Sequence, residues 1–302
     1  MTAQNDMQPA LTHLLKNISQ QVFPDSALYV IATPIGNAAD ISLRALHVLS
    51  LADAIFCEDT RTTKSLLTFY GISKPVISAH AHNEREAANH VISRLQKKER
   101  IALVSDAGTP SISDPGARMV ETVRLANFRV IPIPGASAAT TALSVSGLMS
   151  EKFYFAGFLP GKVSQRKTFL ENMRNVDATL VFYEAPHRVI QTIEAMQSVF
   201  EQDRKILIAR ELTKLFEKIH QCRLANALDW LMENEKQVRG EFVLLLEGKI
   251  KRKDELHEET VRILSILLSE YSTSQAVSLA ARMTGMKKNL LYQHALQMKD
   301  EK

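Results

Sequence analysis

The stretch Leu103-Val-Ser-Asp-Ala-Gly-Thr-Pro-Ser-Ile-Ser-Asp-Pro-Gly116 decides the fold of this chain. It continues the apolar run 101–104, which predicts a short buried strand. Turn-forming Gly, Pro, Ser and Asp residues follow at once, and a helical pattern of apolar residues begins at Met119. A polar loop between a strand and a helix is where open α/β sheets bind ligands. The alternative is a connection without a ligand, but such connections usually take about two to six residues and this one is longer.

Strands and helices alternate on both sides of this stretch. In the first half, strands are expected at 28–33, 54–57, 76–79, 101–104 and 130–133. With helical patterns between them, they predict a mostly parallel, doubly wound sheet. In the second half, strands are expected at 153–158, 179–182, 206–208, 218–223 and 242–246. Because only a short gap separates 206–208 from 218–223, we expect these two to pair antiparallel in a mixed sheet.

The sequence predicts four segments. They are an N-terminal extension at 1–27, an α/β domain at 28–148, a second α/β domain at 149–248 and a helical tail at 249–302. In the extension, the spacing of Leu11, Leu14, Leu15 and Ile18 predicts a short amphipathic helix that docks on the body. In the tail, two helical patterns flank Gly285, which is the outline of a helix-turn-helix.

The tail carries a basic surplus. From Lys249 to Lys302, ten Lys and Arg residues stand against seven Asp and Glu residues, in a chain of net charge +4. Lys287 and Lys288 open the last helical pattern, where a recognition helix would begin. This bias favours binding of nucleic acid without demonstrating it. The alternative is a packed helical hairpin whose lysines are only solvated.

Several classes of protein are not supported. No G-x-G-x-x-G occurs, which argues against a dinucleotide fold and against the usual glycine-rich methyltransferase loop. Gly157-Phe-Leu-Pro-Gly-Lys162 has the wrong spacing for a phosphate-binding P-loop. His80 and His82 have no other Cys or His cluster near them in the sequence, so no metal site is expected. The two cysteines, the lack of a secretory signal pattern and the lack of a membrane-length apolar run predict a cytoplasmic protein without membrane spans.

Polar, turn-rich loops follow the expected strands in both halves. They lie at 34–37, 58–63, 80–84, 105–116, 134–138, 183–188, 210–213 and 240–241. Because strand ends gather on one rim of a wound sheet, these loops would line a cleft with apolar walls, backbone donors and a few charges. Such a cleft suits an organic cofactor.

Longer motifs occur in these loops: Thr33-Pro-Ile-Gly-Asn37, Glu58-Asp-Thr-Arg61, Ser105-Asp-Ala-Gly-Thr-Pro110, Ser113-Asp-Pro-Gly116, Pro134-Gly-Ala-Ser137, Glu184-Ala-Pro-His-Arg188 and Arg210-Glu-Leu-Thr213. They resemble the loops of the ribosomal RNA small subunit methyltransferase I family, which belongs to the tetrapyrrole-methylase fold class. The resemblance covers about residues 28–248 and the helical tail, and leaves the N-terminus up to Ser26 unmatched. It implies two α/β domains with S-adenosylmethionine in the cleft between them, usually in a homodimer. It also implies methylation of the ribose 2′-hydroxyl of a decoding-centre cytidine in the 16S rRNA of the small ribosomal subunit.

The resemblance further implies cofactor contacts in both domains. In the first domain these are Pro34, Asp106, Gly108, Ser111, Ile112 and Ser137. In the second domain they are Phe182, Tyr183, Arg210 and a residue near Gly240. Ile112 and Phe182 also have an ordinary interpretation as core residues.

A ribose hydroxyl is a poor nucleophile until it loses its proton, so we expect a general base near the acceptor. The candidates are Glu58, Asp59, His82 and Glu211. Each of them could instead form a structural salt bridge or cap a loop. Arg61, Arg188 and Arg210 could hold substrate phosphate or could instead pair with those carboxylates. In the tail, Lys287 and Lys288 could hold substrate phosphate.

Two other functions stay open from the sequence. A methyltransferase that uses S-adenosylmethionine to modify a tetrapyrrole or another small molecule would share the fold. A non-catalytic ribosome-binding or nucleic-acid-binding protein could be built around the helix-turn-helix. Cofactor binding would separate the last of these from the two enzymes, and the identity of the methyl acceptor would separate the enzymes.

Overall fold

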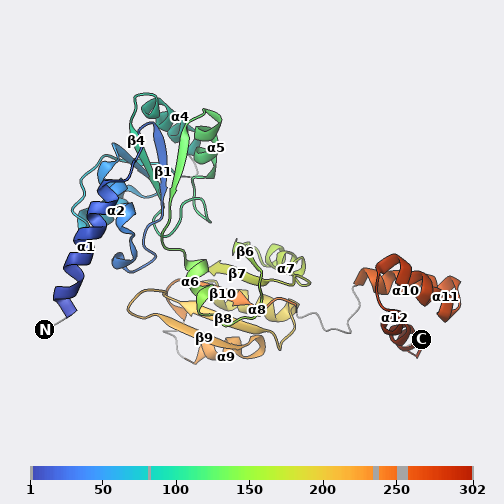
Figure 1. The fold of residues 1–302 in the computed structure, drawn as a ribbon. Helices are drawn as coiled ribbons and strands as arrows, with labels where there is room; N and C mark the ends of the chain where they lie inside the picture. The colour runs from blue at the N-terminus through green and yellow to red at the C-terminus, as the bar shows by residue number, and fades with distance from the viewer. Residues whose placement is uncertain (1–2, 81–82, 234–237, 250–257, 301–302) are drawn as a thin grey trace. The chain divides into compact units, whose positions relative to one another are not determined.

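The computed structural model describes residues 3–80, 83–233, 238–249 and 258–300. The chain forms two compact units, residues 1–249 and 250–302, which are described separately. The larger unit has two lobes, each built on one sheet (Figure 1). Because both lobes belong to one compact unit, the four-segment division with a boundary near residue 148 stays a prediction. Within the described ranges, no helix is both long and apolar enough to cross a membrane.

The first lobe is a five-stranded parallel sheet. Its strands are β1 (Ala27–Ile31), β2 (Ala54–Cys57), β3 (Val76–Ser78), β4 (Arg100–Val104) and β5 (Arg129–Ile133), in the order β3-β2-β4-β1-β5. The connecting helices are α2 (Leu43–Leu51), α3 (Thr60–Phe69), α4 (Glu84–Leu95) and α5 (Ala117–Leu125). In β1, Tyr29 belongs to the hydrophobic cluster on one face and Leu28 to the cluster on the other. Burial on both faces is typical of parallel sheets. The prediction of a mostly parallel, doubly wound sheet for the first half of the chain is confirmed.

The second lobe is a mixed five-stranded sheet. Its strands are β6 (Phe153–Phe158), β7 (Thr179–Glu184), β8 (Lys205–Arg210), β9 (Lys218–Arg223) and β10 (Phe242–Leu246), in the order β6-β7-β10-β8-β9. Strands β6 and β7 run parallel, whereas the other neighbouring strands run antiparallel. The antiparallel pair predicted from the short gap is β8 with β9.

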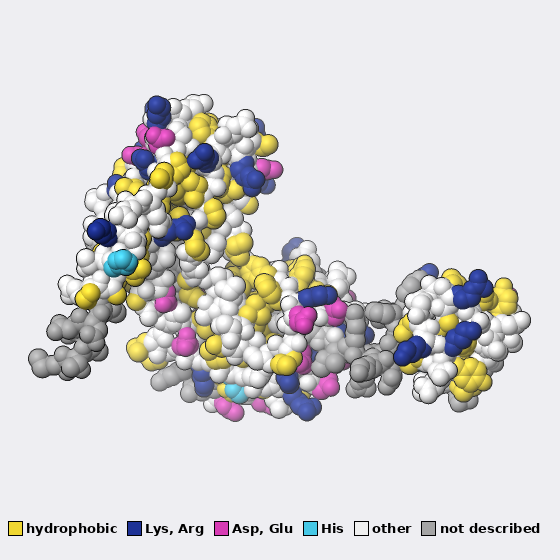
Figure 2. Space-filling view, in the orientation of Figure 1, with side chains coloured by type: hydrophobic (Ala, Val, Ile, Leu, Met, Phe, Trp, Pro, Cys, Tyr) yellow, Lys and Arg dark blue, Asp and Glu magenta, His cyan; other side chains and the backbone are white. Residues whose placement is uncertain are grey.

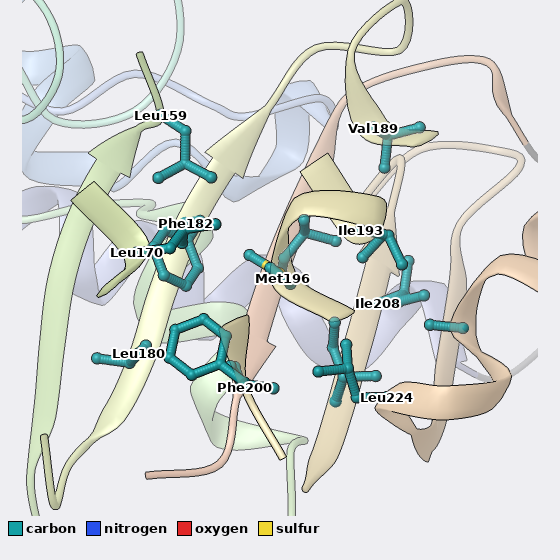
Figure 3. Close-up of a cluster of buried hydrophobic side chains, with 14 of the residues drawn as sticks. Leu159, Leu170, Leu180, Phe182, Val189, Ile193, Met196, Phe200, Ile208 and Leu224 are labelled. Atoms are coloured by element: carbon teal, nitrogen blue, oxygen red, sulfur yellow. The ribbon is translucent and has the colours of Figure 1, made fainter. Parts of the chain in front are cut away.

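Helices lie on both faces of this second sheet. α7 (Val163–Glu171), α8 (Val189–Val199) and α9 (Ala227–Met232) pack over a hydrophobic cluster that contains Phe182 (Figure 3). α6 (Ala138–Ser144) packs on the opposite face with Val181 and Leu245. Because successive side chains of a strand point to opposite faces, Phe182 lies under α7 and α8, whereas Tyr183 lies on the α6 side.

Helix α1 (Ala3–Ser19) precedes the first lobe and contacts α2. Ile18 is buried, whereas Leu11, Leu14 and Leu15 are 37%, 46% and 54% exposed. The helix predicted from their spacing is present, but burial of these four residues is limited to the one in its last turn.

The smaller unit contains α10 (Glu258–Glu270), α11 (Thr273–Thr284) and α12 (Lys288–Asp300). Leu264, Val277 and Leu291 belong to its hydrophobic core. Gly285 has a left-handed φ of 71°, and its N–H donates to the carbonyl oxygen of Ala281. This is the usual glycine ending of a helix, and it turns the chain from α11 into α12. The helix-turn-helix outline predicted for the tail is therefore present.

Candidate active site

A cavity of about 330 Å³ lies between the two lobes of the larger unit. Its walls come from the loops after β1, β4 and β5 and, across from them, from β7, β10 and the loops beside them. Hydrophobic side chains gather where the two lobes adjoin (Figure 2). A concave site of this size with largely apolar walls and a few polar groups suits a small organic ligand.

The polar loop 105–116 after β4 forms part of the first-lobe wall. After β4 ends, Gly108 and Thr33 exchange two backbone hydrogen bonds of 2.9 and 3.1 Å. Ser111 and Ser113 have φ values of 69° and 64°. Each such non-glycine residue stores about 1–3 kcal/mol of strain, which a structure retains mostly at functional sites. Together with its place on the cavity wall, this strain favours a ligand-binding loop over a plain connection.

Contacts from both lobes hold this loop in place. At the start of α4, Oε1 of Glu84 accepts hydrogen bonds from the backbone N–H groups of Gly116 (2.9 Å) and Arg118 (3.1 Å). On the second lobe, a Cβ atom at Gly157 would lie only 2.9 Å from Oγ of Ser113. Strand β6 therefore approaches the loop as closely as a glycine allows.

Tyr183 forms part of the second-lobe wall. Its ring packs edge-on against Phe155 and Phe158, with centroids 4.9 and 5.7 Å apart. Its hydroxyl oxygen accepts a hydrogen bond of 3.2 Å from the N–H of Ala139 in the first turn of α6. Burial raises the pKa of the Tyr183 hydroxyl, so this group is neutral at physiological pH.

Four of the residues implied as cofactor contacts line the cavity: Gly108, Ile112, Ser137 and Tyr183. Ile112 is 45% exposed, which argues against its interpretation as a core residue. Phe182 is fully buried in the cluster under α7 and α8, as the core interpretation expected. Its side chain faces away from the cavity, so a cofactor could meet only its backbone.

The other implied cofactor contacts lie outside the lining: Pro34, Asp106, Ser111, Arg210 and Gly240. Ser111 has a buried hydroxyl oxygen with no hydrogen-bond partner among the described residues. Asp106 accepts a hydrogen bond of 3.1 Å from the N–H of Asp59 through Oδ1. The roles of these residues as cofactor contacts stay predictions.

Arg210 and Gly240 lie close to the loop that follows β8. The Arg210 guanidinium donates to the carbonyl oxygen of Phe216 at 3.0 Å. Gly240 has φ of 89°, and a Cβ atom there would overlap the side chain of Glu211. Glycine at this position therefore lets Glu211 lie against the backbone.

Two of the candidate bases are held in ion pairs. Asp59 contacts Arg61 at 2.7 Å, and hydrogen bonds from Arg61 lower the pKa of Asp59 to about 2. Partial burial works to raise the pKa of Glu211, but hydrogen bonds from Lys214 and a backbone N–H lower it overall. Carboxylates of low pKa bind protons weakly, which makes them poor bases at neutral pH. His82, the third candidate, lies outside the described residues.

Glu58, the fourth candidate base, has a different environment. Burial raises the pKa of the Glu58 carboxyl, and the neighbouring Asp106 carboxylate adds to this, while His80 works against it. Glu58 therefore keeps the proton affinity that a base requires. No group of three or more His, Cys, Asp or Glu side chains in the described part of the chain is arranged to hold a metal ion.

Asp114 and Glu184 line the cavity, although the sequence did not single them out as site residues. Burial raises the pKa of Asp114 to about 6, with contributions from the carboxylates of Glu58 and Asp106, while a hydrogen bond with Ser105 partly opposes the shift. Asp114 lies inside the stretch that decides the fold. A run of turn formers gives no sign of which member becomes buried, so the sequence offered no signal for this role.

The basic residues expected to hold substrate have varied environments. The Arg61 side chain is 89% exposed. Nε of Arg188 lies 3.3 Å from Oε1 of Glu184, and its guanidinium donates to the carbonyl oxygen of Leu159. Lys287 and Lys288 are exposed in the smaller unit, immediately before and at the start of α12. Substrate binding by these residues stays a prediction.

Two protein-family models match the chain. Residues 27–228 match the tetrapyrrole (corrin/porphyrin) methylases, and residues 254–299 match the RsmI C-terminal HTH domain. Among solved structures, the methyltransferase CobJ superposes with a TM-score of 0.57 at 18% identity, covering 75% of this chain and 95% of that one. A uroporphyrin-III-C-methyltransferase from Thermus thermophilus superposes with a TM-score of 0.54 at 16% identity, covering 74% and 94%. At these identities, the structures establish a common fold only.

Similarity to curated proteins is much higher. Ribosomal RNA small subunit methyltransferase I from Haemophilus influenzae is 46% identical over 271 residues, covering 89% of this chain and 96% of that protein. The protein of the same name from Escherichia coli O157:H7 is 44% identical over 270 residues, covering 89% and 94%. These matches confirm the expected fold class and family. The chain belongs to the tetrapyrrole (corrin/porphyrin) methylases and, among them, to the ribosomal RNA small subunit methyltransferase I family.

Proposed function

We propose that this protein transfers a methyl group from S-adenosylmethionine to the ribose 2′-hydroxyl of a decoding-centre cytidine in 16S rRNA. The observation that carries the proposal is identity of 44–46% over 89% of the chain to relatives named ribosomal RNA small subunit methyltransferase I. The ribose position and the cytidine rest on the resemblance of the loop motifs to that family. A small-molecule acceptor is supported by the broad corrin/porphyrin family model and by a fold neighbour, uroporphyrin-III-C-methyltransferase, at only 16% identity.

The residues around the cavity fit S-adenosylmethionine. Ser111 lies in the cavity-lining loop after β4, and its buried hydroxyl has no partner among the described residues, so it is available to a ligand. The carboxylate of Asp114 on the cavity wall suits a positively charged ligand. Gly108, Ile112 and Tyr183 would hold the cofactor from the two lobes. When bound, it supplies a methyl group on a positively charged sulfur.

The protein's own contribution is alignment and exclusion of water. Methyl transfer to a hydroxyl is an in-line displacement. The protein must therefore hold the acceptor oxygen in line with the methyl carbon and the sulfur of the cofactor. Apolar walls from both lobes flank the cavity, and a bound cofactor between them would displace water that competes with the hydroxyl.

Transfer of labelled methyl groups to undermethylated small ribosomal subunits tests the proposal. We expect nuclease digestion to release the label as 2′-O-methylcytidine. Binding of S-adenosylmethionine without labelled RNA would favour a small-molecule acceptor. A protein that binds no S-adenosylmethionine would contradict the enzyme proposal as a whole.

We also propose that the protein acts as a homodimer, in the cytoplasm where ribosomal subunits are found. Around the turn between β8 and β9, Leu215, Phe216 and Ile219 are 89%, 69% and 39% exposed. An exposed apolar group of this kind is typical of an interaction surface. Sedimentation equilibrium should give a dimer for the wild type and a monomer for Phe216→Glu. A wild type that stays monomeric at micromolar concentration would rule out the dimer.

The tail should contribute to RNA affinity. Replacing Lys287 and Lys288 together with alanine should weaken binding to small subunits about threefold to tenfold and lower the slope of log K against log salt by about two, because each lysine would neutralise a phosphate. Lys97→Ala with Arg124→Ala is the matched control, since both side chains are exposed near the C-terminal ends of α4 and α5, at the amino edge of the first sheet. Equal salt slopes for the two double variants would exclude the tail from RNA binding.

A further inference from the structure

We propose that the exposed face of α12 binds unpaired nucleotides of the RNA substrate, with Tyr292 as the side chain on which a base stacks. The inference rests on the proposed function, because it takes RNA as the substrate. It names the RNA element that the smaller unit binds, which the proposed function leaves open.

The residues of α12 divide into a core face and an exposed face. Leu291 and Ala295 are fully buried in the hydrophobic core that α12 shares with α10 and α11. The exposed face consists of two neighbouring rows, in each of which residues recur every four positions, as they do along one side of a helix. One row is Lys288, Tyr292 and Leu296, and the other is Asn289, Gln293 and Gln297. All six side chains are exposed, so this face is available to a partner.

The chemical groups on this face suit RNA. Lys288 supplies a cation, and Tyr292 supplies an aromatic ring that is 46% exposed. The amides of the other row can both donate and accept hydrogen bonds. These are the groups that bind phosphate, stack on bases and pair with the edges of bases. Neither row contains a carboxylate, which would repel the RNA backbone.

Cations gather at the end of the face where α12 begins. Lys287 and Lys288 are exposed there, and Arg282 is exposed in the last turn of α11, across the turn at Gly285. The first turn of α12 contains no acidic residue. Because the helix dipole makes the N-terminal end of α12 positive, lysines at this end do not stabilise the helix. An anionic partner explains their position, and a phosphate backbone is such a partner.

The geometry of RNA decides which element this face can bind. In a helix-turn-helix that binds DNA, the second helix enters the major groove. The major groove of A-form RNA is deep and narrow, and side chains cannot read it. Unpaired nucleotides are different, because their bases are open to stacking and their edges to hydrogen bonds. Tyr292 follows Lys288 by one helical turn, about 5–6 Å between Cβ atoms, so a stacked base and a bound phosphate can lie side by side.

The first test measures binding of the full chain to undermethylated small subunits. Tyr292→Ala should weaken the affinity about fivefold or more, because the stack with the base is lost. Tyr292→Phe keeps the ring and should stay within about twofold of wild type. Tyr292→Leu keeps an apolar side chain without a ring and should lose nearly as much affinity as Tyr292→Ala. An affinity of Tyr292→Ala within about twofold of wild type, or full rescue by leucine, would overturn the proposal.

Tyr271→Ala is the matched control. Tyr271 is 50% exposed in the same unit, but it precedes α11, whereas the turn into α12 follows α11. The 12 residues of α11 separate these two places by about 18 Å. The control should bind small subunits as tightly as wild type. Equal losses in Tyr271→Ala and Tyr292→Ala would indicate a general effect on the smaller unit and overturn the proposal.

Salt dependence separates stacking from charge. Tyr292→Ala should leave the slope of log K against log salt unchanged, because stacking releases no counterions. Replacement of both Lys287 and Lys288 with alanine should lower this slope. If Tyr292→Ala lowers the slope as much as the double replacement does, the ring acts only by placing the lysines, and the proposal is overturned. At saturating subunits, kcat of Tyr292→Ala should stay within about twofold of wild type, because the cavity belongs to the larger unit.

Oligonucleotides test the RNA element with the wild type itself. The probes are an RNA hairpin with 2-aminopurine in its unpaired loop and a fully paired RNA duplex with the same number of phosphates. Wild type should bind the hairpin about fivefold tighter than the duplex and quench the 2-aminopurine, and Tyr292→Ala should lose both effects. Equal wild-type affinity for the two probes would overturn the proposal.

Two further outcomes assign a failure to its cause. If Tyr292→Ala weakens binding to small subunits but not to the hairpin, the face binds a ribosomal protein and the proposal is overturned. If wild type methylates small subunits and no Tyr292 variant changes their binding, the proposed function stands and this inference alone fails. A wild type that binds neither small subunits nor the hairpin would contradict both.

Discussion

Replacing Glu184 with alanine should lower the free energy of unfolding by about 3–5 kcal/mol, because the change removes one partner of a buried ion pair. The Glu184 side chain is fully buried. Its oxygens accept hydrogen bonds from the Thr192 hydroxyl at 2.6 Å and from the N–H of Ala185 at 2.9 Å, and Nε of Arg188 lies 3.3 Å away. Arg188 is only 22% exposed, so the alanine variant would leave a largely buried cation without its anion.

Urea unfolding of a set of variants would measure this effect. Thr192→Val removes one hydrogen bond and should cost about 1 kcal/mol, and Glu184→Gln should fall between the two, since it keeps an acceptor but loses the charge. Arg174→Ala is the control, because its contact with Glu201 spans 3.9 Å between side chains that are 59% and 40% exposed. Its cost should stay within about 0.5 kcal/mol. A loss below about 1 kcal/mol for Glu184→Ala would mean that the buried pair contributes little to the fold.

The same network supports the cavity. Glu184 lies on the cavity wall, and Arg188 ties it to the carbonyl oxygen of Leu159, which follows the cavity-lining Phe158. Arg188, in the motif Glu184-Ala-Pro-His-Arg188, was predicted to hold substrate phosphate or to pair with a carboxylate. Its position here indicates a role in fixing the cavity wall, which a motif alone does not distinguish from substrate binding.

Local patterns in the sequence were sufficient to predict where the strands lie in the chain. They were not sufficient to predict which strands are neighbours in a sheet. The run of apolar residues in β10 predicts a buried strand, yet its place between β7 and β8 depends on packing of segments far apart in the chain. The same holds for α6, which follows β5 in sequence but packs on the second sheet. Hydrophobic periodicity indicates which face of each helix or strand is buried. The order of strands in a sheet depends instead on the packing of complete helices and strands against one another.

Alternation along a strand explains one difference within the predicted site. Phe182 and Tyr183 were both expected to contact the cofactor, but adjacent strand residues point to opposite faces. In the structure, Tyr183 lines the cavity and the side chain of Phe182 lies in the hydrophobic core. This outcome could have been anticipated from the strand alone, because the side chains of both residues cannot face one cavity.

The pKa shifts of the acidic residues could be predicted from the sequence to different extents. Asp59 has its cation two residues away in Arg61, so its low proton affinity was visible in principle from the sequence. The burial of Asp114 and its closeness to Glu58 arise only when the loops after β2 and β4 meet at the edge of the sheet. Electrostatic environment is a property of the folded site, and local sequence motifs do not contain it.

Replacing Gly36 with alanine should weaken cofactor binding at least about tenfold while lowering the free energy of unfolding by only about 1–2 kcal/mol. A Cβ atom at Gly36 would lie 2.5 Å from Cγ of Lys214, 2.8 Å from Oγ1 of Thr213 and 3.0 Å from the carbonyl oxygen of Leu212. The lysine stem can move aside, but the carbonyl oxygen belongs to the backbone. The loop after β1 and the loop after β8 would therefore have to separate.

Both of these loops line the cavity, the first through Ile35 and the second through Leu212. They are also joined by a hydrogen bond of 3.1 Å from the N–H of Asn37 to Oγ1 of Thr213. We expect the fold to tolerate a small separation of these two loops, whereas the cavity that they line should not. Calorimetry with S-adenosylhomocysteine, beside urea unfolding, would separate the two effects.

Gly161→Ala is the matched control, since a Cβ atom there meets nothing within 4 Å and its φ is not in the left-handed region. It should leave both cofactor affinity and stability close to wild type. If Gly36→Ala binds S-adenosylhomocysteine as tightly as the control, the close approach of the two loops does not set the cavity. If it instead loses affinity and stability in parallel, the glycine serves the fold as a whole. Selective loss of affinity is the result expected if the close approach of the two lobes at Gly36 positions the walls of the cavity.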